Sequence, residues 1–465
     1  MNSYEDLREF IGQVEKLGAL RRVEGADPIY EIGGITEVAA GTPECPAILF
    51  DSIKGFPRGF RVFTNATVSA QRAALALGID PQLPPIEALK EWRTRRSELK
   101  MHKPRLVKEG PVFQNSSREV DLSRFPAPVW HKDDGGPYIG SGSIVVMRDP
   151  DSGWVNASIY RVQVHDKQRV TVQFDHAGRH GAIIAKRYWD AGKPCPLAVV
   201  NGPDPALFIA GFEYLPEGAS EYDFAGAIRG RPLDVVEAPL TGLPVPARAE
   251  IVFEGFLSTD TLPEGPFGEF TGYYAADKRP APVMKVEAMH WRNDPVLLGS
   301  PPMKPPRFHF GLPFRAASMW SQLEAAGVTD VVGAWQHVAQ LMTVIALKQR
   351  YAGHAKRAGL IAAAQSYMGR IVVTVDEDVD PSNLADVMWA VATRCEPSEQ
   401  VDIVRSAWSS GLDPRITPEA RARGDTSHSK LIIDACKPFG WKDRYPRTSA
   451  LTAEEAGAIR GKWFR

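Results

Sequence analysis

The stretch Pro263-Glu264-Gly265-Pro266-Phe267-Gly268-Glu269-Phe270-Thr271-Gly272-Tyr273 carries two carboxylates five residues apart, with two glycines and a proline between them. In a regular strand, this odd spacing would place Glu264 and Glu269 on opposite faces. Because Gly permits positive φ and Pro fixes φ, a bent segment can turn both carboxylates toward one point. Two carboxylates in one pocket can acquire different pKa values, so that one donates a proton while the other stays charged. Taken alone, the same composition is more typical of a solvated hairpin tip.

The composition is that of an ordinary globular protein. The chain has 465 residues, too many for one hydrophobic core, and this predicts two or three domains. Lys and Arg total 55 against 56 for Asp and Glu, so nothing indicates a nucleic acid or an anionic membrane as partner. No apolar run is about 18 residues long, and we therefore expect no membrane span.

The cysteines and the N-terminus predict a cytoplasmic location. Four cysteines lie far apart with no CxxC motif, which is typical of reduced thiols rather than of a disulfide framework or zinc ribbon. The acidic N-terminal residues do not form a signal peptide. The cysteines are Cys45, Cys195, Cys395 and Cys436.

Hydrophobic patterns divide the chain into three domains and a tail. Residues 1–115 alternate between helical stretches (7–17, 69–77, 86–99) and short strand-like runs, which predicts an α/β domain. Residues 116–314 hold many short β-type runs with few helices, which favours a barrel or sandwich with a pocket where loops converge. The runs are 143–147, 158–164, 169–174, 197–200, 249–256 and 284–289.

The predicted third domain, residues 315–440, is again α/β. Residues 316–326 and 331–347 have helical spacing, 370–376 reads as a buried strand, and 382–393 follows as a helix. The tail, 441–465, carries basic and aromatic side chains. It either packs on a partner subunit or is loose.

Two further motifs could carry chemistry. Asn156 and Arg161 flank and enter a β-type run, and an Arg aimed into a pocket can hold a carboxylate or phosphate through two parallel hydrogen bonds. Alone, this segment is as well explained by a surface Arg at a strand end. The segment 173–183 runs from a strand through a Gly-containing loop into a helix, whose first N–H groups could receive a phosphate beside Arg179.

Metal ligands of the hard-cation type lie near these motifs. His176 or His180 could bind a metal through a neutral imidazole. Glu221 opens a helix, where the helix dipole alone would also explain an acid. One Asn, one His and one Glu suit Mn²⁺ or Mg²⁺ with a phosphate completing the shell, and suit structural zinc poorly.

Together, these motifs resemble the UbiD family of non-oxidative decarboxylases, which use prenylated FMN. The resemblance covers most of the chain, and order and spacing both match. It implies an N-terminal α/β domain, a central split β-barrel cofactor domain and a C-terminal α/β oligomerisation domain. The matching residues are Asn156 with Ser158-Ile159-Tyr160-Arg161, Arg179-His180, Glu221, Glu264 to Glu269, Asp376 to Asp380, and Trp389 to Cys395.

The resemblance also implies roles for individual residues. Arg161, Glu264 and Glu269 would form the catalytic ionic network. Asn156, His180 and Glu221 would hold a Mn²⁺ on the cofactor phosphate, with His176 as a rival to His180. The prenylated flavin would be lined by Ser158, Ile159, Tyr160, Arg161 and Arg179.

One departure from the family weakens the expectation of a K⁺ ion. Relatives that act on cinnamate-type acids carry two serines before the metal-binding glutamate, near a monovalent cation. Here the corresponding stretch is Gly211-Phe212-Glu213. The K⁺ site is therefore doubtful, and the phosphate-contacting lysine of the family has no clear counterpart.

The activity implied is the reversible decarboxylation of an aromatic, heteroaromatic or α,β-unsaturated carboxylic acid, with release of CO₂. Glu269 would donate the proton, and Arg161 and Glu264 would orient it and the substrate. A flavin prenyltransferase would supply the cofactor, and the chain would form a homodimer or larger homo-oligomer. Alternatives are a glycoside hydrolase with paired carboxylates and a non-catalytic flavin-binding subunit. The expected pocket wall, which favours an aromatic acid, comprises Pro301, Pro302, Met303, Phe308, Phe310 and Trp335.

Overall fold

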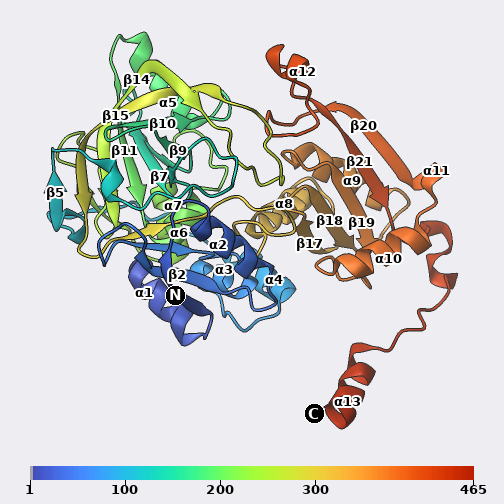
Figure 1. Ribbon diagram of the computed structural model, residues 1–465. Helices are drawn as coiled ribbons and strands as arrows, with labels where there is room; N and C mark the ends of the chain where they lie inside the picture. The colour runs from blue at the N-terminus through green and yellow to red at the C-terminus, as the bar shows by residue number, and fades with distance from the viewer. Residues whose placement is uncertain (1–3, 465) are drawn as a thin grey trace.

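The computed structural model describes residues 4–464 and has two lobes (Figure 1). The first lobe, coloured blue to yellow, contains a small sheet with helices and a large bent sheet. The second, orange to red, contains one sheet with helices on its faces, and a separate helix at the end of the chain. None of the helices in residues 4–464 is long and apolar enough to cross a membrane.

The N-terminal sheet is completed by a strand from much later in the chain. Its strand order is β1-β2-β3-β16, with β16 parallel to β3. Helix α1 packs its apolar stripe inward, and Asp6 caps it by accepting a hydrogen bond from the Glu9 N–H. The strands are β1 (Leu20–Ala26), β2 (Ala47–Ile53), β3 (Arg61–Thr64) and β16 (Val296–Leu298), and the helices are α1 (Leu7–Lys16), α2 (Glu31–Gly41), α3 (Ala70–Leu77) and α4 (Pro85–Ser97).

The central sheet has nine strands among the described residues, and every pairing in it is antiparallel. Its order is β6-β9-β10-β15-β14-β11-β7-β8, with β5 added on β15. The strands are β5 (Asn115–Ser117), β6 (Tyr138–Gly140), β7 (Ile144–Arg148), β8 (Val155–Ser158), β9 (Arg161–Val164), β10 (Arg169–Gln173), β11 (Cys195–Asn201), β14 (Ile251–Glu264) and β15 (Arg279–Trp291).

The connection between β8 and β9 closes this sheet into a split barrel. The two strands are consecutive in the chain, yet β8 is the last strand in the order and β9 is the second, next to the edge strand β6. Ser158 ends β8 and Arg161 begins β9, so the chain has only three Cα steps, about 11 Å, to join the two edges. The sheet must curl until its edges meet. The predicted split barrel is confirmed, whereas the single strand expected over 158–164 is wrong because the chain crosses the split at Ile159 and Tyr160.

The opening motif lies at the tip of the long β14–β15 hairpin. Glu264 is the last residue of β14 and pairs with Arg279, the first residue of β15. The interpretation as a hairpin tip is therefore correct, but its two carboxylates are not solvated, since Glu264 is fully buried and Glu269 is 7% exposed. Shorter elements surround the barrel: α5 (His180–Asp190), α6 (Pro205–Ala210), α7 (Glu221–Arg229), β4 (Arg105–Leu106), β12 (Asp234–Glu237), β13 (Pro244–Pro246), η1 (Pro111–Phe113) and η2 (Leu122–Arg124).

The second lobe is a five-stranded sheet of order β17-β18-β19-β21-β20, covered on both faces. Helix α9 packs with Val372 and Ile432 on one face, and α10 packs with Val344 and Val373 on the other. Its elements are α8 (Phe314–Ala325), β17 (Val331–His337), β18 (Met342–Leu347), α9 (His354–Gln365), β19 (Ile371–Asp376), α10 (Leu384–Arg394), α11 (Pro397–Gln400), β20 (Val401–Ala407), α12 (Pro418–Ala422), β21 (His428–Asp434), η3 (Phe439–Arg444) and α13 (Ala453–Trp463).

The helix expected over 331–347 is wrong. That segment is a hairpin, in which β17 and β18 pair antiparallel. Its turn places Val338, Ala339 and Gln340 at φ of 50°, 53° and 71°. Non-glycine residues seldom adopt such angles, and the turn carries no Gly or Pro to indicate a break between two strands.

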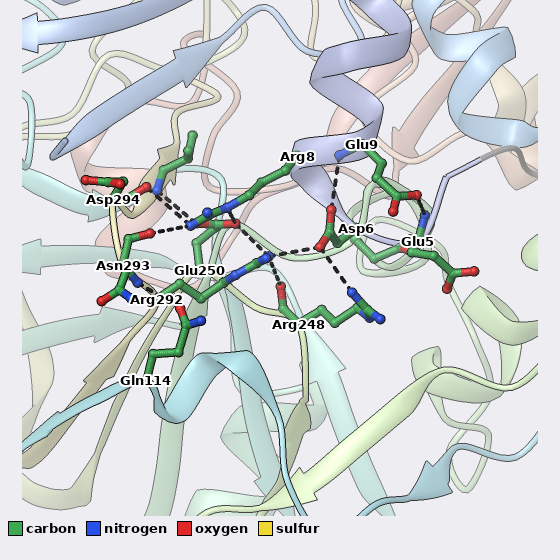
Figure 2. A network of polar contacts seen from close by, with 12 residues as sticks. Glu5, Asp6, Arg8, Glu9, Gln114, Arg248, Glu250, Arg292, Asn293 and Asp294 are labelled. Carbon is green, nitrogen blue, oxygen red and sulfur yellow. Dashed lines mark hydrogen bonds and ion pairs between the residues drawn. The ribbon is translucent and has the colours of Figure 1, made fainter.

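A buried ion network joins helix α1 to the central sheet (Figure 2). The Glu250 carboxylate, fully buried, accepts both hydrogen bonds of a bidentate pair with Arg8 at 2.8 Å and a third from Arg292 at 3.0 Å. Arg292 also donates to Asp6 at 2.9 Å. The backbone N–H of Val296, at the start of β16, donates to Glu250 at 3.1 Å. One carboxylate thus ties the N-terminal sheet to the barrel.

We expect Glu250→Ala to destabilise the first lobe by about 3–5 kcal/mol, because it leaves two arginines without their buried counter-charge. The midpoint and slope of urea unfolding, followed by tryptophan fluorescence, measure this change. The control is Asp234→Ala, which breaks the more exposed pair with Arg105 and should shift the midpoint little. Equal shifts for the two variants would contradict a structural role for the Glu250 network.

Candidate active site

A cavity of about 420 Å³ lies between the split barrel and the second lobe. Seven of the predicted site residues that line it share a short region of the barrel and its first helices. These are Ser158, Ile159, Tyr160, Arg161, Arg179, His180 and Glu221. Glu269 also lines the cavity, whereas Glu264 and Asn156 do not, and both of the latter are fully buried behind its wall.

Arg161 and the two glutamates form one buried ionic cluster. The guanidinium donates two parallel hydrogen bonds to Glu264, from Nε at 2.7 Å and from Nη2 at 2.9 Å. Its Nη1 donates to Glu269. The Arg161 side chain is 12% exposed. The stretch from Glu264 to Glu269 therefore does turn both carboxylates toward one cation.

Local backbone geometry explains how Glu264 and Glu269 converge. Gly265 has φ of +89°, which favours glycine, and this bends the chain directly after β14. A tight turn then fixes Glu269: its N–H donates to the carbonyl of Tyr273 at 3.0 Å, and its carbonyl accepts from Gly272 at 2.8 Å. Strand β14 therefore ends at Glu264, and the chain has turned back into the protein by Glu269, five residues later.

The two carboxylates have different surroundings. Burial raises the pKa of Glu269 above its usual value, and the opposing effect of Arg161 does not cancel this rise. Glu264 accepts three hydrogen bonds, two from Arg161 and one from the Tyr138 hydroxyl at 2.8 Å, the arrangement that a charged carboxylate prefers. Glu269 is thus the acid of the pair whose pKa burial raises, and it is the one that reaches the cavity.

Of the predicted metal ligands, His180 and Glu221 line the cavity and Asn156 lies behind Glu221. The Asn156 amide donates to Glu221 at 2.8 Å, and the N–H of Ala157 donates to the other oxygen of that carboxylate at 2.9 Å. Burial raises the pKa of Glu221 to about 7. Such a desolvated carboxylate is suited to a cation, because a bound positive charge offsets the cost of burying it.

The two histidines of the loop differ in their contacts. His180, the first residue of α5, contacts Trp154 edge-to-face with ring centroids 4.8 Å apart, and burial lowers its pKa, which favours the neutral imidazole. The Nδ1 of His176, an exposed residue, accepts from the Gly178 N–H at 3.2 Å. Within the described part of the chain, no three residues of the His, Cys, Asp or Glu types cluster as metal ligands. A metal ion at this position would therefore need the Asn156 side chain, or oxygens of a bound molecule, to complete its coordination.

Arg179 supplies positive charge beside these ligands. Its guanidinium lies over the Tyr160 ring, 5.3 Å from the centroid, and its buried Nε has no hydrogen-bond partner in the protein. The Tyr160 hydroxyl in turn accepts from the N–H of Gly181 in the first turn of α5 at 2.9 Å. A cation, a helix N-terminus without a side-chain cap from its own N-cap residue, and a carboxylate that suits a metal ion together fit a phosphate with its metal.

Comparison with known proteins identifies the family. Models of the 3-octaprenyl-4-hydroxybenzoate carboxy-lyase match along the chain: the N-terminal domain at residues 11–95, the Rift-related domain at 105–305 and the C-terminal domain at 309–435. The chain belongs to the UbiD family. This confirms the predicted family and the predicted carboxy-lyase class over the glycoside hydrolase alternative.

Two curated relatives of the chain are decarboxylases of ring-containing acids. It is 33% identical to a phenolic acid decarboxylase from Streptomyces sp. (strain D7), over 94% of this chain and 93% of the relative. It is 32% identical to a pyrrole-2-carboxylic acid decarboxylase from Pseudomonas aeruginosa, over 93% of this chain and 91% of the relative.

A solved structure of similar fold is the UbiD-class enzyme HmfF from Pelotomaculum thermopropionicum in complex with FMN. It gives a TM-score of 0.85 at 30% identity, covering 97% of this chain and 98% of that one. An evolved dimeric form of HmfF, in complex with prFMN, gives a TM-score of 0.81 at 30% identity, covering 96% and 97%.

The cavity wall of this UbiD-family chain differs in part from the expected one. Pro302 and Phe308 line the cavity as predicted. The expectation was wrong for Pro301, Met303, Phe310 and Trp335, which are not among its lining residues. Met303 packs against Cys45 and Ala40, while Phe310 and Trp335 belong to the hydrophobic core. Aromatic side chains are common in cores, so their position in the chain did not indicate a role in the pocket.

The sequence did not predict several residues of the site. Tyr138 and Gln163 brace the hairpin tip: Tyr138 bonds Glu264, and the Gln163 amide oxygen accepts from the Gly265 N–H at 3.0 Å. Gln163 follows Arg161 by two residues in β9, so the two side chains lie on the same face of the strand. This spacing was the one feature of the sequence that could have indicated Gln163. The second lobe adds Arg315, Gln340, Tyr367 and Trp408 to the cavity wall.

Proposed function

We propose that this chain catalyses the reversible, non-oxidative decarboxylation of an aromatic or heteroaromatic acid with prenylated FMN. α,β-Unsaturated acids form a second candidate class. One observation carries the proposal: a buried Arg161 holds two carboxylates, and only Glu269 of these opens on the cavity. The decarboxylases that the chain resembles, and the FMN and prFMN complexes of HmfF, support the same reaction class and cofactor.

The residues divide into a cofactor end and a reacting end. Asn156, His180 and Glu221 would hold Mn²⁺ on the cofactor phosphate, with Arg179 as a further phosphate contact. Ser158, Ile159 and Tyr160 would line the flavin. We propose Mn²⁺ without K⁺, because Gly211 and Phe212 offer no hydroxyl and the Ser158 hydroxyl already donates to the Gly211 carbonyl at 3.2 Å. A flavin prenyltransferase would supply the cofactor, which serves as the electron sink for the carbanion left by CO₂ loss.

The protein's own part in the reaction is to handle a proton and to exclude water. Glu269 donates its proton to the carbon that has lost CO₂, and takes one back in the carboxylation direction. Arg161 fixes the position of Glu269 and lowers the cost of its negative charge after the transfer. Glu264, held by Arg161 and Tyr138, stays charged and keeps the guanidinium in place. Phe270, Pro302 and Phe308 line the cavity with apolar side chains, which disfavour water there.

Glu269→Gln should lower kcat by about 10²–10⁴-fold, since Gln keeps the shape but cannot deliver a proton. Flavin retention, read from the absorption spectrum, should be unchanged. The assay is CO₂ release from a panel of phenolic and heteroaromatic acids by protein co-expressed with a flavin prenyltransferase. In D₂O, the wild type should also exchange the product C–H, and Glu269→Gln should not.

The matched variant is Glu264→Gln, which removes the neighbouring charge but leaves the proposed donor. If it loses product exchange while Glu269→Gln keeps it, the donor is Glu264. A wild type that retains prenylated FMN and releases no CO₂ from any acid would be a non-catalytic flavin-binding subunit.

Asn156→Ala, His180→Ala and Glu221→Ala should each lose cofactor and manganese, because each removes one proposed ligand of the ion. Flavin absorbance and bound manganese per chain are the measurements, with circular dichroism to check folding. His176→Ala is the control from the same loop and should keep both. Full cofactor in His180→Ala together with its loss in His176→Ala would make His176 the ligand.

The chain should self-associate through residues beyond about 315. Helix α13 has a capping box at Thr452 and Glu455, yet Ile459 and Trp463 on it are exposed, and an isolated helix of this length is marginal in water. In Figure 1 it lies apart from both lobes. Helix α10 also exposes apolar side chains, Leu384, Met388 and Trp389. We propose that such faces of α13 and α10 meet between copies.

Light scattering should therefore give a mass that is a multiple of 51.1 kDa at micromolar concentration. Ile459→Ala with Trp463→Ala should shift the mass toward the monomer, whereas Glu454→Ala, an exposed residue on the opposite side of α13, should not. A monomeric wild type would refute self-association, and an unchanged oligomer in the double variant would refute the role of α13.

A further inference from the structure

A turn at residues 131–135 is hydrogen-bonded to the hairpin tip that carries Glu269. The N–H of Gly268 donates to one oxygen of the Asp134 carboxylate at 2.9 Å, and the N–H of His131 donates to the other at 3.0 Å. The Gly135 N–H donates to the carbonyl of Pro266 at 2.8 Å. The Asp134 side chain is completely buried. Two hydrogen bonds thus link the turn to the residues directly before Glu269.

The backbones of the turn at 131–135 and of the hairpin tip are in direct contact. A Cβ on Gly135 would lie 1.9 Å from the carbonyl oxygen of Gly265, which excludes any side chain there without a shift of backbone. A Cβ on Gly268 would lie 2.7 Å from Nδ1 of His131. A side chain on either side of this contact would therefore displace the tip or the turn.

The turn carries its own counter-charge. His131 Nδ1 lies 3.4 Å from Asp134. Although burial alone would lower the pKa of His131, the nearby Asp134 carboxylate outweighs that effect and raises it. The buried carboxylate is therefore compensated by backbone N–H groups and by the imidazole of its own turn, and does not depend on Arg161.

We infer that Asp134 is a positioning residue for the reaction. It fixes the Gly268 peptide, and Glu269 is the next residue, so the anchor sets where the Glu269 carboxylate meets Arg161 and the cavity. This inference rests on the proposed role of Glu269 as proton donor. A displacement of about 1 Å in a reacting group can cost about 10²-fold in rate, so an anchor outside the cavity lining can control turnover.

Asp134→Ala should lower kcat by about 10–100-fold by this misplacement and leave KM nearly unchanged, because the cavity wall is untouched. In protein without cofactor, amide hydrogen exchange of residues 264–273 should become faster, since the Gly268 N–H loses its acceptor. Asp134→Asn keeps one acceptor oxygen and should recover part of the lost kcat.

Asp149→Ala is the matched control. Asp149 is also buried, accepts from two backbone N–H groups of its own turn at 2.8 and 3.0 Å, and pairs with Arg187, but it does not contact the hairpin tip. Its loss should lower thermal stability without changing kcat or exchange at 264–273. Gly135→Ala pushes on the tip sterically, with no change in charge, and should reproduce the kcat loss of Asp134→Ala.

Equal kcat and equal exchange at 264–273 in the Asp134→Ala and Asp149→Ala variants would overturn the inference. So would a fall in kcat without faster exchange at the tip. If the wild type itself decarboxylates no acid, the proposed function fails, and the exchange measurement on cofactor-free protein still decides whether Asp134 anchors the tip.

Discussion

The candidate active site depends on placing two carboxylates against one guanidinium with little exposure to water. Burying three ionisable groups is expensive, and the cost is recovered only when geometry is good and the remaining hydrogen-bonding capacity is filled. Here Arg161 binds Glu264 through a bidentate pair and Glu269 through its third nitrogen, and Tyr138 supplies a further donor. One cation with two acids leaves an excess of negative charge, which a proton on Glu269 removes. The proton that lowers the cost of burying the cluster is thus the one that Glu269 is proposed to donate.

The split in the barrel brings the two ends of the site together. Asn156, a proposed metal ligand, and Arg161, of the proposed reacting cluster, are five residues apart in sequence, on the strands β8 and β9 that one short connection joins. A strand running straight through this segment would alternate its side chains between two faces. Crossing the split instead lets Ser158, Ile159, Tyr160 and Arg161 all line one cavity.

The sequence predicted what depends on short-range spacing and failed where distant segments decide. The Glu264–Glu269 stretch, the Arg161 strand and the loop before α5 each carry a local signal, and their order indicated the family. The helix expected over 331–347 failed because a hairpin turn at Val338, Ala339 and Gln340 uses positive φ without glycine. Tyr138, Asp134 and Arg315 were missed for another reason: each acts on residues far away in sequence, and nothing beside them in the chain marks that contact.

The two lobes contribute differently to the site, and this separates chemistry from substrate choice. The reacting cluster, the proposed metal ligands and the turn at 131–135 all belong to the first lobe, where Glu250 and strand β16 tie the N-terminal sheet to the barrel. The second lobe adds only wall residues, including Arg315, Gln340 and Tyr367. The side-chain hydrogen bonds of Arg161, Glu264 and Glu269 that the structure shows within residues 4–464 all stay in the first lobe. Changes in the wall of the second lobe can therefore alter which acid fits while the proposed proton donor keeps its place. A scaffold of this kind can serve phenolic and heteroaromatic acids alike with one ionic cluster.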